Sequence, residues 1–100
     1  MYHIFFFDPV NDFLKGLPET ERAKILATTD TMKSGNFHSL RVKTLKTPIK
    51  ELIIKQYRFI FFINENIIHF VGAFIKKSAK TPRKEIQRAE RIYKLVRQAK

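Results

Sequence analysis

Three apolar runs in the middle of the chain place the strongest limit on its fold. They span residues 51–55, 57–63 and 67–75, and all three are short and rich in Ile and Phe. Runs of this length and composition are typical of β-strands. Because apolar residues occupy both alternating positions, we expect central strands covered on both sides for much of their length. Asn64-Glu65-Asn66 has the chemistry of a short hairpin connection between the last two runs.

The first forty residues predict one short strand followed by two helices. Residues 2–7 are prone to β-structure, and Asp8-Pro9 ends that run. Apolar residues then follow at helical spacing: Val10, Phe13, Leu14 and Leu17. Pro18 suits the first turn of a second helix, and Ser34-Gly35-Asn36 is its stop signal. We expect the two helices to form a hairpin that packs on the sheet.

A connecting segment and a C-terminal helix complete the prediction. Residues 36–50 hold polar and basic groups together with Pro48, which predicts a loop or an irregular edge strand. Thr81-Pro82 predicts an N-cap followed by the first helical residue. Apolar residues then recur at helical spacing up to the C-terminus: Ile86, Ala89, Ile92, Tyr93 and Val96. At 100 residues we expect a single domain spanning 1–100.

Positive charge is concentrated in the second half of the chain. Residues 1–40 hold four Lys and Arg against five acids, a net charge of −1. Residues 41–100 hold sixteen Lys and Arg against four acids, a net charge of +12, so the chain carries +11. This excess favours an anionic partner, with nucleic acid ahead of an anionic membrane surface or an acidic protein. We therefore expect the anion-binding surface in the second half and scaffold in the first.

Several classes of protein are disfavoured by what the sequence lacks. It has no cysteine, which excludes disulfides and thiolate metal sites. Its three histidines are widely spaced and match no metal-ligand pattern, and we expect His69 to be a satisfied structural residue. The longest apolar stretch, Phe59–Ile63, is far short of the roughly 20 residues that a membrane span needs. We expect a cytoplasmic protein that uses no metal or cofactor and does not bind a membrane.

Basic residues surround the predicted sheet. They are Arg41, Lys43, Lys46 and Lys50 before it, Lys55 and Arg58 within it, and Lys76, Lys77 and Lys80 after it. Arg58 stands out because it lies inside an apolar strand, and a guanidinium is rarely buried without a partner. Either Arg58 pairs with Glu51 on the neighbouring strand, or it faces an anion-binding concavity. The sequence supports both alternatives equally.

Two segments resemble the RelE/HigB superfamily of toxins, in particular its phage-derived branch. They are Gln56–Phe62, with its strand arginine, and Phe74–Ala89, with its Phe-x-Lys-Lys-x-x-Lys-Thr-Pro run. The resemblance covers residues 40–98 by motif and residues 1–39 by the order of elements. It implies an α+β fold, in which an antiparallel β-sheet packs against two N-terminal helices and a C-terminal helix.

The resemblance also implies a function and a set of site residues. It implies the toxin of a type II toxin–antitoxin system, a metal-independent endoribonuclease that cuts messenger RNA on the ribosome, with a cognate antitoxin that we expect to be a helix-turn-helix protein. Arg58 corresponds to the catalytic strand arginine, and Lys76 and Lys77 to the catalytic basic pair after the strand. We expect the following residues to bind RNA: Arg41, Lys43, Lys46, Lys55, Lys80 and Arg83.

The expected chemistry is attack of a ribose 2′-hydroxyl on its own phosphate, which leaves a cyclic phosphate. Because the nucleophile is already tethered, positioning and charge stabilisation supply much of the rate enhancement. Arg58 would clamp the phosphate oxygens, and Lys76 or Lys77 would donate or accept a proton. A hairpin centred on Glu65 pairs positions that sum to about 130, which places Arg58 opposite Gly72, where there is room for a phosphate. By parity, Lys76 lies on the same face as Gly72.

Ile53 leaves two alternatives open. Relatives often carry Glu-Leu-Arg-Ile where this chain has Glu51-Leu52-Ile53-Ile54, so one usual basic residue is missing. The first alternative is a basic RNA- or ribosome-binding protein with no catalytic activity. The second is an inactive toxin homologue retained as an antitoxin partner.

Overall fold

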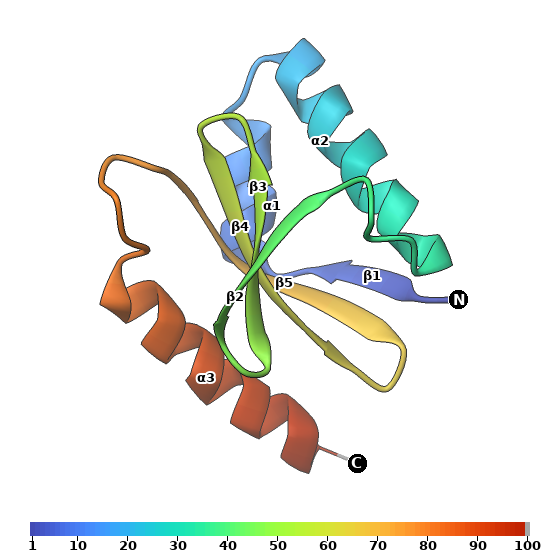
Figure 1. Ribbon diagram of the computed structural model, residues 1–100, viewed down its shortest axis with the longest axis vertical. Helices are drawn as coiled ribbons and strands as arrows, with labels where there is room; N and C mark the ends of the chain where they lie inside the picture. Colours follow the sequence, from blue (N-terminus) through green and yellow to red (C-terminus); the bar gives the residue numbers. More distant parts are fainter. Residues whose placement is uncertain (100) are drawn as a thin grey trace.

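Five strands form one sheet in the order β1-β5-β4-β3-β2 (Figure 1). They are β1 (His3–Phe6), β2 (Arg41–Lys46), β3 (Ile49–Ile54), β4 (Tyr57–Asn64) and β5 (Ile67–Ile75). The computed structural model describes residues 1–99. Successive strands from β2 to β5 pair antiparallel, as predicted, whereas β1 runs parallel to β5 and makes the sheet mixed.

Segment 36–50 contains more strand than the sequence predicted. Its second part forms the edge strand β2, and Ile49 and Lys50 already belong to β3. The pairing of β2 with β3 shifts register between Thr44 and Lys46, so the edge strand is irregular, which was one of the two expectations. Thr47 and Pro48 form the tight turn between the two strands.

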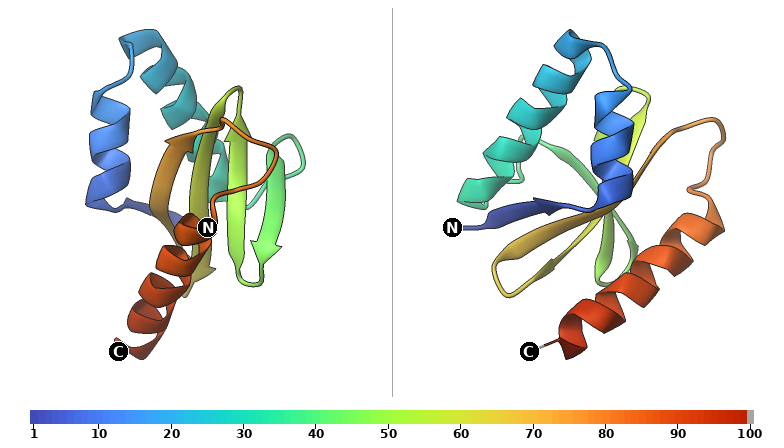
Figure 2. Two further views of the ribbon diagram at one scale, coloured as in Figure 1. Left: turned by 90° about the vertical axis from the view of Figure 1, so that its left-hand side faces the viewer. Right: turned by 180° about the vertical axis from the view of Figure 1, so that it is seen from behind.

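Helices cover both faces of the sheet. They are α1 (Asp8–Lys15), α2 (Glu19–Thr31), the short 3-10 helix η1 (Met32–Ser34) and α3 (Arg83–Gln98). The α1–α2 hairpin was predicted, and α1 lies behind the sheet in Figure 1 and in front of it in the right panel of Figure 2. Within residues 1–99, no helix is long and apolar enough to cross a membrane.

Strand β4 divides the core into two clusters. Tyr57, Phe59 and Phe61 pack with residues of α1 and α2, on what we call the α1/α2 face. Ile60 and Phe62 pack with residues of α3, on what we call the α3 face. Residues 59–62 are completely buried, which confirms the expectation that a central strand is covered on both sides.

The predicted register of the β4–β5 hairpin was wrong. Its turn consists of two residues, Glu65 and Asn66, with φ angles of 49° and 65°, rather than three residues centred on Glu65. A bulge next to Phe61 then shifts the register again. Arg58 therefore lies opposite Phe74, and Gly72 lies opposite Ile60. A bulge depends on packing across the sheet, so the alternation of the sequence did not reveal it.

Candidate functional site

Four side chains form a row across the α3 face. Phe74, Arg58, Ile53 and Arg41 are cross-strand partners on β5, β4, β3 and β2. Neighbouring strands are about 4.8 Å apart, so the backbones of Arg58 and Arg41 are about 10 Å apart. Ile53 between them is partly buried and Arg41 is exposed. Two arginines thus lie on either side of Ile53, the position at which the sequence resemblance leads us to expect a basic residue.

Arg58 is held in place by its neighbours. Its side chain is buried, and Nη1 donates hydrogen bonds to the carbonyl oxygens of Lys55, at 2.6 Å, and Tyr57, at 3.0 Å. Nε lies 3.6 Å from Oε2 of Glu51, so the pairing with Glu51 is present, although this buried Nε has no hydrogen-bond partner. Within residues 1–99, Nη2 makes no hydrogen bond. The guanidinium is therefore fixed in position by Nη1, while neither Nε nor Nη2 makes a hydrogen bond in residues 1–99.

Glu51 also ties the loop before α3 to the sheet. Its carboxylate is 1% exposed and accepts a hydrogen bond from the hydroxyl of Thr81. The prediction that Thr81 is the N-cap of α3 was therefore wrong: α3 begins at Arg83, and Pro82 occupies the cap position. A buried carboxylate needs donors, whereas water can satisfy the amides of an exposed helix end.

Gly72 makes room for an ion pair of α3 rather than for a phosphate. A Cβ atom on Gly72 would lie 3.0 Å from Oε1 of Glu85 and 3.3 Å from Nη2 of Arg88. Glu85 and Arg88 form an ion pair with each other. The expectation of a phosphate at Gly72 was therefore wrong. The i, i+3 spacing of Glu85 and Arg88 was the signal in the sequence that could have indicated this pair.

The two candidate lysines after β5 differ in position. Lys76 is half-buried, and its backbone amide donates to the carbonyl oxygen of Gln56 at 2.8 Å. This bond extends the pairing of β4 with β5 by one residue, so Lys76 falls diagonal to Arg58 and on the predicted face. Lys77 is exposed and lines a cavity.

That cavity, of about 470 Å³, lies between the end of β5, the loop that follows it, the start of α3 and α1. Its lining residues are Phe13, Ala73, Phe74, Ile75, Lys77, Ser78, Lys80, Pro82, Lys84 and Glu85. Three of them are lysines, and the single carboxylate, Glu85, is already paired with Arg88. The cavity is therefore suited to an anionic ligand. Lys84 was not among the predicted site residues.

The other predicted RNA-binding residues fall into two groups. Arg41 and Lys43 are exposed on β2, where Lys43 lies opposite Glu51. Lys46 and Arg83 line a smaller cavity of about 320 Å³ between β2 and α3. Lys55 lies apart from both groups, because its Nζ is 3.4 Å from Oε2 of Glu21 on α2. The structure thus brings most of the predicted cations to the α3 side but not Lys55.

Two titratable groups in the core have shifted pKa values. Burial lowers the pKa of His69, which lies among the rings of Phe5, Phe7 and Phe62. Neither ring nitrogen of His69 has a hydrogen-bond partner, so it is buried as expected but not satisfied. Burial, and then the Glu21 carboxylate, raise the pKa of Tyr57. Within residues 1–99, no group of His, Cys, Asp and Glu side chains could hold a metal ion.

Comparisons with known proteins agree with this fold. The model of the family described as "Phage derived protein Gp49-like (DUF891)" matches residues 12–94. No curated protein matches the sequence. Among solved structures, the RelE–RelB complex from Pyrococcus horikoshii OT3 is similar, with a TM-score of 0.68 and 17% identity over 78% of this chain and 98% of that chain.

Two further structures give similar values. The RelB–RelE antitoxin–toxin complex from Methanococcus jannaschii has a TM-score of 0.61 and 19% identity over 83% of this chain and 94% of that chain. The isolated E. coli RelE toxin has a TM-score of 0.61 and 12% identity over 92% of this chain and 99% of that chain. At these identities the similarity is one of fold.

Proposed function

Because this chain belongs to the phage-derived Gp49-like family and has the fold of RelE toxins, we propose that it is the toxin of a type II toxin–antitoxin system and cleaves messenger RNA without a metal ion. The observation that carries this proposal is the fixed guanidinium of Arg58 on the charged α3 face. A guanidinium held by its neighbours loses little conformational freedom when it binds a phosphate. Its Nη2 is the nitrogen that supports phosphate binding.

The chemistry proposed for this site is intramolecular. A ribose 2′-hydroxyl attacks the adjacent phosphorus, the bond to the 5′-oxygen breaks, and the products are a cyclic phosphate and a free 5′-hydroxyl. Arg58 stabilises the charge that develops on the phosphate oxygens. Lys76, diagonal to Arg58, or Lys77 transfers the proton. Because the reacting groups belong to one molecule, orientation supplies much of the rate enhancement.

The remaining cations bind the RNA chain on either side of the reacting phosphate. These residues are Arg41, Lys43, Lys46, Lys80 and Arg83. We exclude Lys55 from this set because its side chain lies beside Glu21 of α2, away from the α3 face. We expect the RNA to be a message on the ribosome in the cytoplasm, and RNA binding to weaken with added salt, because each phosphate contact releases counterions.

A cognate antitoxin is the second partner that we propose. Two of the similar structures are RelE–RelB complexes. A cationic surface that cleaves messenger RNA must be blocked by a bound partner while the cell grows. We expect an antitoxin with acidic or apolar segments to cover the α3 face, and a neighbouring gene for a helix-turn-helix protein is the candidate. Co-expression with that gene should restore growth and yield a stable complex.

Ile53 favours a second candidate function, an inactive toxin homologue that still binds its antitoxin. The isoleucine lies between Arg41 and Arg58, where a further cation would face the same phosphate. Such a protein would bind RNA or antitoxin but would create no new RNA ends.

The decisive experiment is induced expression with mapping of new RNA 5′ ends. The wild-type chain should arrest growth and create new ends, whereas Arg58→Ala should lower the cleavage rate per folded molecule by about two to three orders of magnitude. Arg22→Ala, which removes the same side chain on α2, is the matched control and should cleave normally. If the wild type makes no new ends, the inactive homologue is the better description. If Arg58→Ala lowers the melting temperature and leaves the rate unchanged, Arg58 is only structural.

A further inference from the structure

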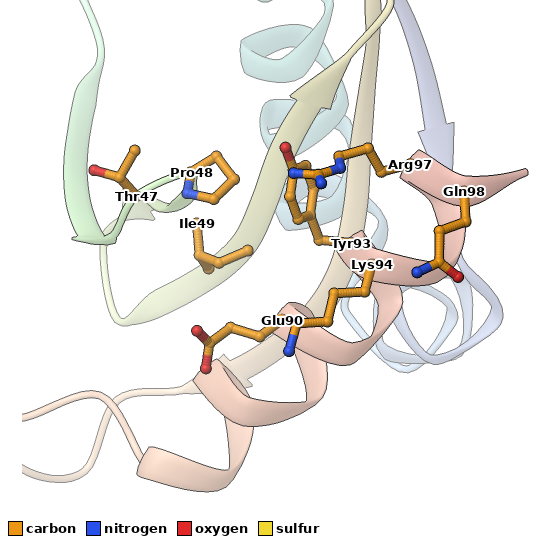
Figure 3. Close-up of a pocket in the computed structure, with 8 residues that line it drawn as sticks. All are labelled: Thr47, Pro48, Ile49, Glu90, Tyr93, Lys94, Arg97 and Gln98. Carbon is orange, nitrogen blue, oxygen red and sulfur yellow. The ribbon is translucent and has the colours of Figure 1, made fainter.

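A separate cavity lies between the β2–β3 turn and the last turns of α3 (Figure 3). Its volume is about 450 Å³, within the range of small-molecule sites. Pro48 and Ile49 line it on the side of the turn, and Glu90, Tyr93, Lys94 and Arg97 line it on the side of the helix. None of these residues belongs to the reactive centre proposed above.

The spacing of the helix residues explains why they share one cavity. Positions 90, 93, 94 and 97 follow the i, i+3, i+4, i+7 pattern of a single helix face. Glu90 and Arg97 are therefore about 10 Å apart along the helix axis. The cavity has a carboxylate near one end and a guanidinium near the other.

The ring of Tyr93 in the cavity is held in position by Phe62 and Arg97. Tyr93 packs edge to face on Phe62, with ring centroids 5.1 Å apart, and the guanidinium carbon of Arg97 lies 5.9 Å from the centre of the Tyr93 ring. With Pro48 and Ile49 opposite, these groups form flat and apolar walls of the kind on which nucleic-acid bases stack.

The charged groups that line the cavity are complementary to the phosphate and the base of a nucleotide. Lys94 and Arg97 are exposed cations that suit a phosphate. The carboxylate of Glu90 repels a phosphate, but it accepts hydrogen bonds from an exocyclic amino group of a base. It also forms an ion pair with Lys46, at 2.9 Å, which fixes its position at the border with the neighbouring cavity.

We propose that this cavity is a subsite for one nucleotide of single-stranded RNA, with the base between Pro48 and Tyr93 and the phosphate on Lys94 and Arg97. The proposal rests on the proposed function and adds a binding position to it. The neighbouring cavity of about 320 Å³ shares Glu90 and contains Lys46 and Arg83, so a strand bound here continues along α3 toward the lysines at the end of β5. This continuity favours RNA over an acidic peptide. Glu90 selects bases that carry an amino group, so cytidine binds more tightly than uridine.

Titration of the full chain with cytidine and uridine monophosphates, followed by calorimetry and by amide chemical shifts, tests the subsite. Cytidine monophosphate should shift the amides of Thr47, Ile49 and residues 90–98. Arg97→Ala should weaken its binding about tenfold, as expected for a lost charge-assisted hydrogen bond. Arg91→Ala removes an exposed arginine from the same helix, but outside this cavity, and should change nothing. Glu90→Gln should abolish the preference for cytidine over uridine.

Three outcomes would overturn the subsite. They are the absence of shifts around the cavity, an equal loss of affinity in Arg97→Ala and Arg91→Ala, and binding of an acidic hexapeptide where cytidine monophosphate does not bind. Nucleotide binding is measured without cleavage, so the two proposals fail separately. A chain that binds cytidine monophosphate here but makes no new RNA ends keeps the subsite and loses the ribonuclease function. A chain that cleaves messages without binding the nucleotide keeps the ribonuclease function and loses the subsite.

Discussion

The α1/α2 face and the α3 face are built by alternate residues of the same strands, yet their chemistry differs. On the α1/α2 face, β4 contributes Tyr57, Phe59 and Phe61 to an aromatic and aliphatic cluster. On the α3 face, the same strand contributes Arg58, which pairs with the buried Glu51 of β3. Charged groups can be buried in fixed positions on the second face because the first face anchors the strands that carry them. The buried ion pair of the candidate site thus lies on one side of the sheet, whereas apolar packing stabilises both sides.

The largest effect on stability is expected on the α1/α2 face. Phe59→Ala removes a completely buried ring that contacts Phe13 and should lower the free energy of unfolding by about 3–5 kcal/mol. Denaturant unfolding measures this loss. The rate of RNA cleavage per folded molecule should stay the same. A change in that rate would show that the α1/α2 face also contributes to the candidate site.

The ion pair on the α3 face should respond differently to single and double replacement. Arg58→Ala leaves the Glu51 carboxylate buried without its cation, which should cost about 3 kcal/mol. The double variant Glu51→Leu/Arg58→Met replaces the buried ion pair with two apolar side chains, and its stability should return to within about 1 kcal/mol of the wild type. Cleavage should remain lost in both. Recovery of cleavage in the double variant would contradict a catalytic role for Arg58.

A smaller loss is expected where α3 meets the sheet. Gly72→Ala places a methyl group against the ends of Glu85 and Arg88, two flexible side chains that can move slightly. The free energy of unfolding should fall by about 1 kcal/mol. Thermal unfolding of this variant measures how tightly the start of α3 is held on the sheet, and an unchanged melting temperature would show that the helix is packed loosely there.

The smallest effect is expected at Lys55. Lys55 is exposed and its partner Glu21 only partly buried, so Lys55→Ala should cost at most about 0.5 kcal/mol. RNA affinity should be unchanged, in contrast to Lys80→Ala, which removes a cation from the cavity at the end of β5. Equal losses of RNA affinity in the two lysine variants would show that the α1/α2 side also contacts RNA.

Local patterns in the sequence predicted most of the fold. The apolar runs predicted β3, β4 and β5, helical spacing predicted α1 and α3, and Pro18 with the Ser34-Gly35-Asn36 stop signal predicted α2. The register of β4 against β5 was not predictable in the same way. The two-residue turn and the bulge next to Phe61 each shifted the partner of Arg58 by one residue, from the predicted Gly72 to Phe74. Choices of this kind depend on how side chains pack across a finished sheet.

The candidate site was predictable in its composition and in part in its contacts. The sequence singled out Arg58 and weighed Glu51 as its partner, and the two lie together. Thr81 was predicted to cap α3, because N-caps are recognised from neighbouring residues in the sequence. The contact between Thr81 and the buried Glu51 carboxylate joins residues far apart in the sequence, and only the folded structure reveals it. Lys94 and Arg97 were not among the predicted site residues, since nothing local indicates that the β2–β3 turn lies beside them.

The parallel pairing of β1 with β5 also affects the order in which the chain folds. His3 pairs with Ile67, so this contact joins residues that are 64 positions apart (67 − 3), whereas the strands from β2 to β5 are joined by tight turns. Contacts between distant residues form slowly, because a long loop must close before they do. During synthesis, the first strand has no neighbour until β5 has left the ribosome. Phe6 therefore lacks Phe70, the β5 ring on which it stacks, for most of the time that the chain is being made.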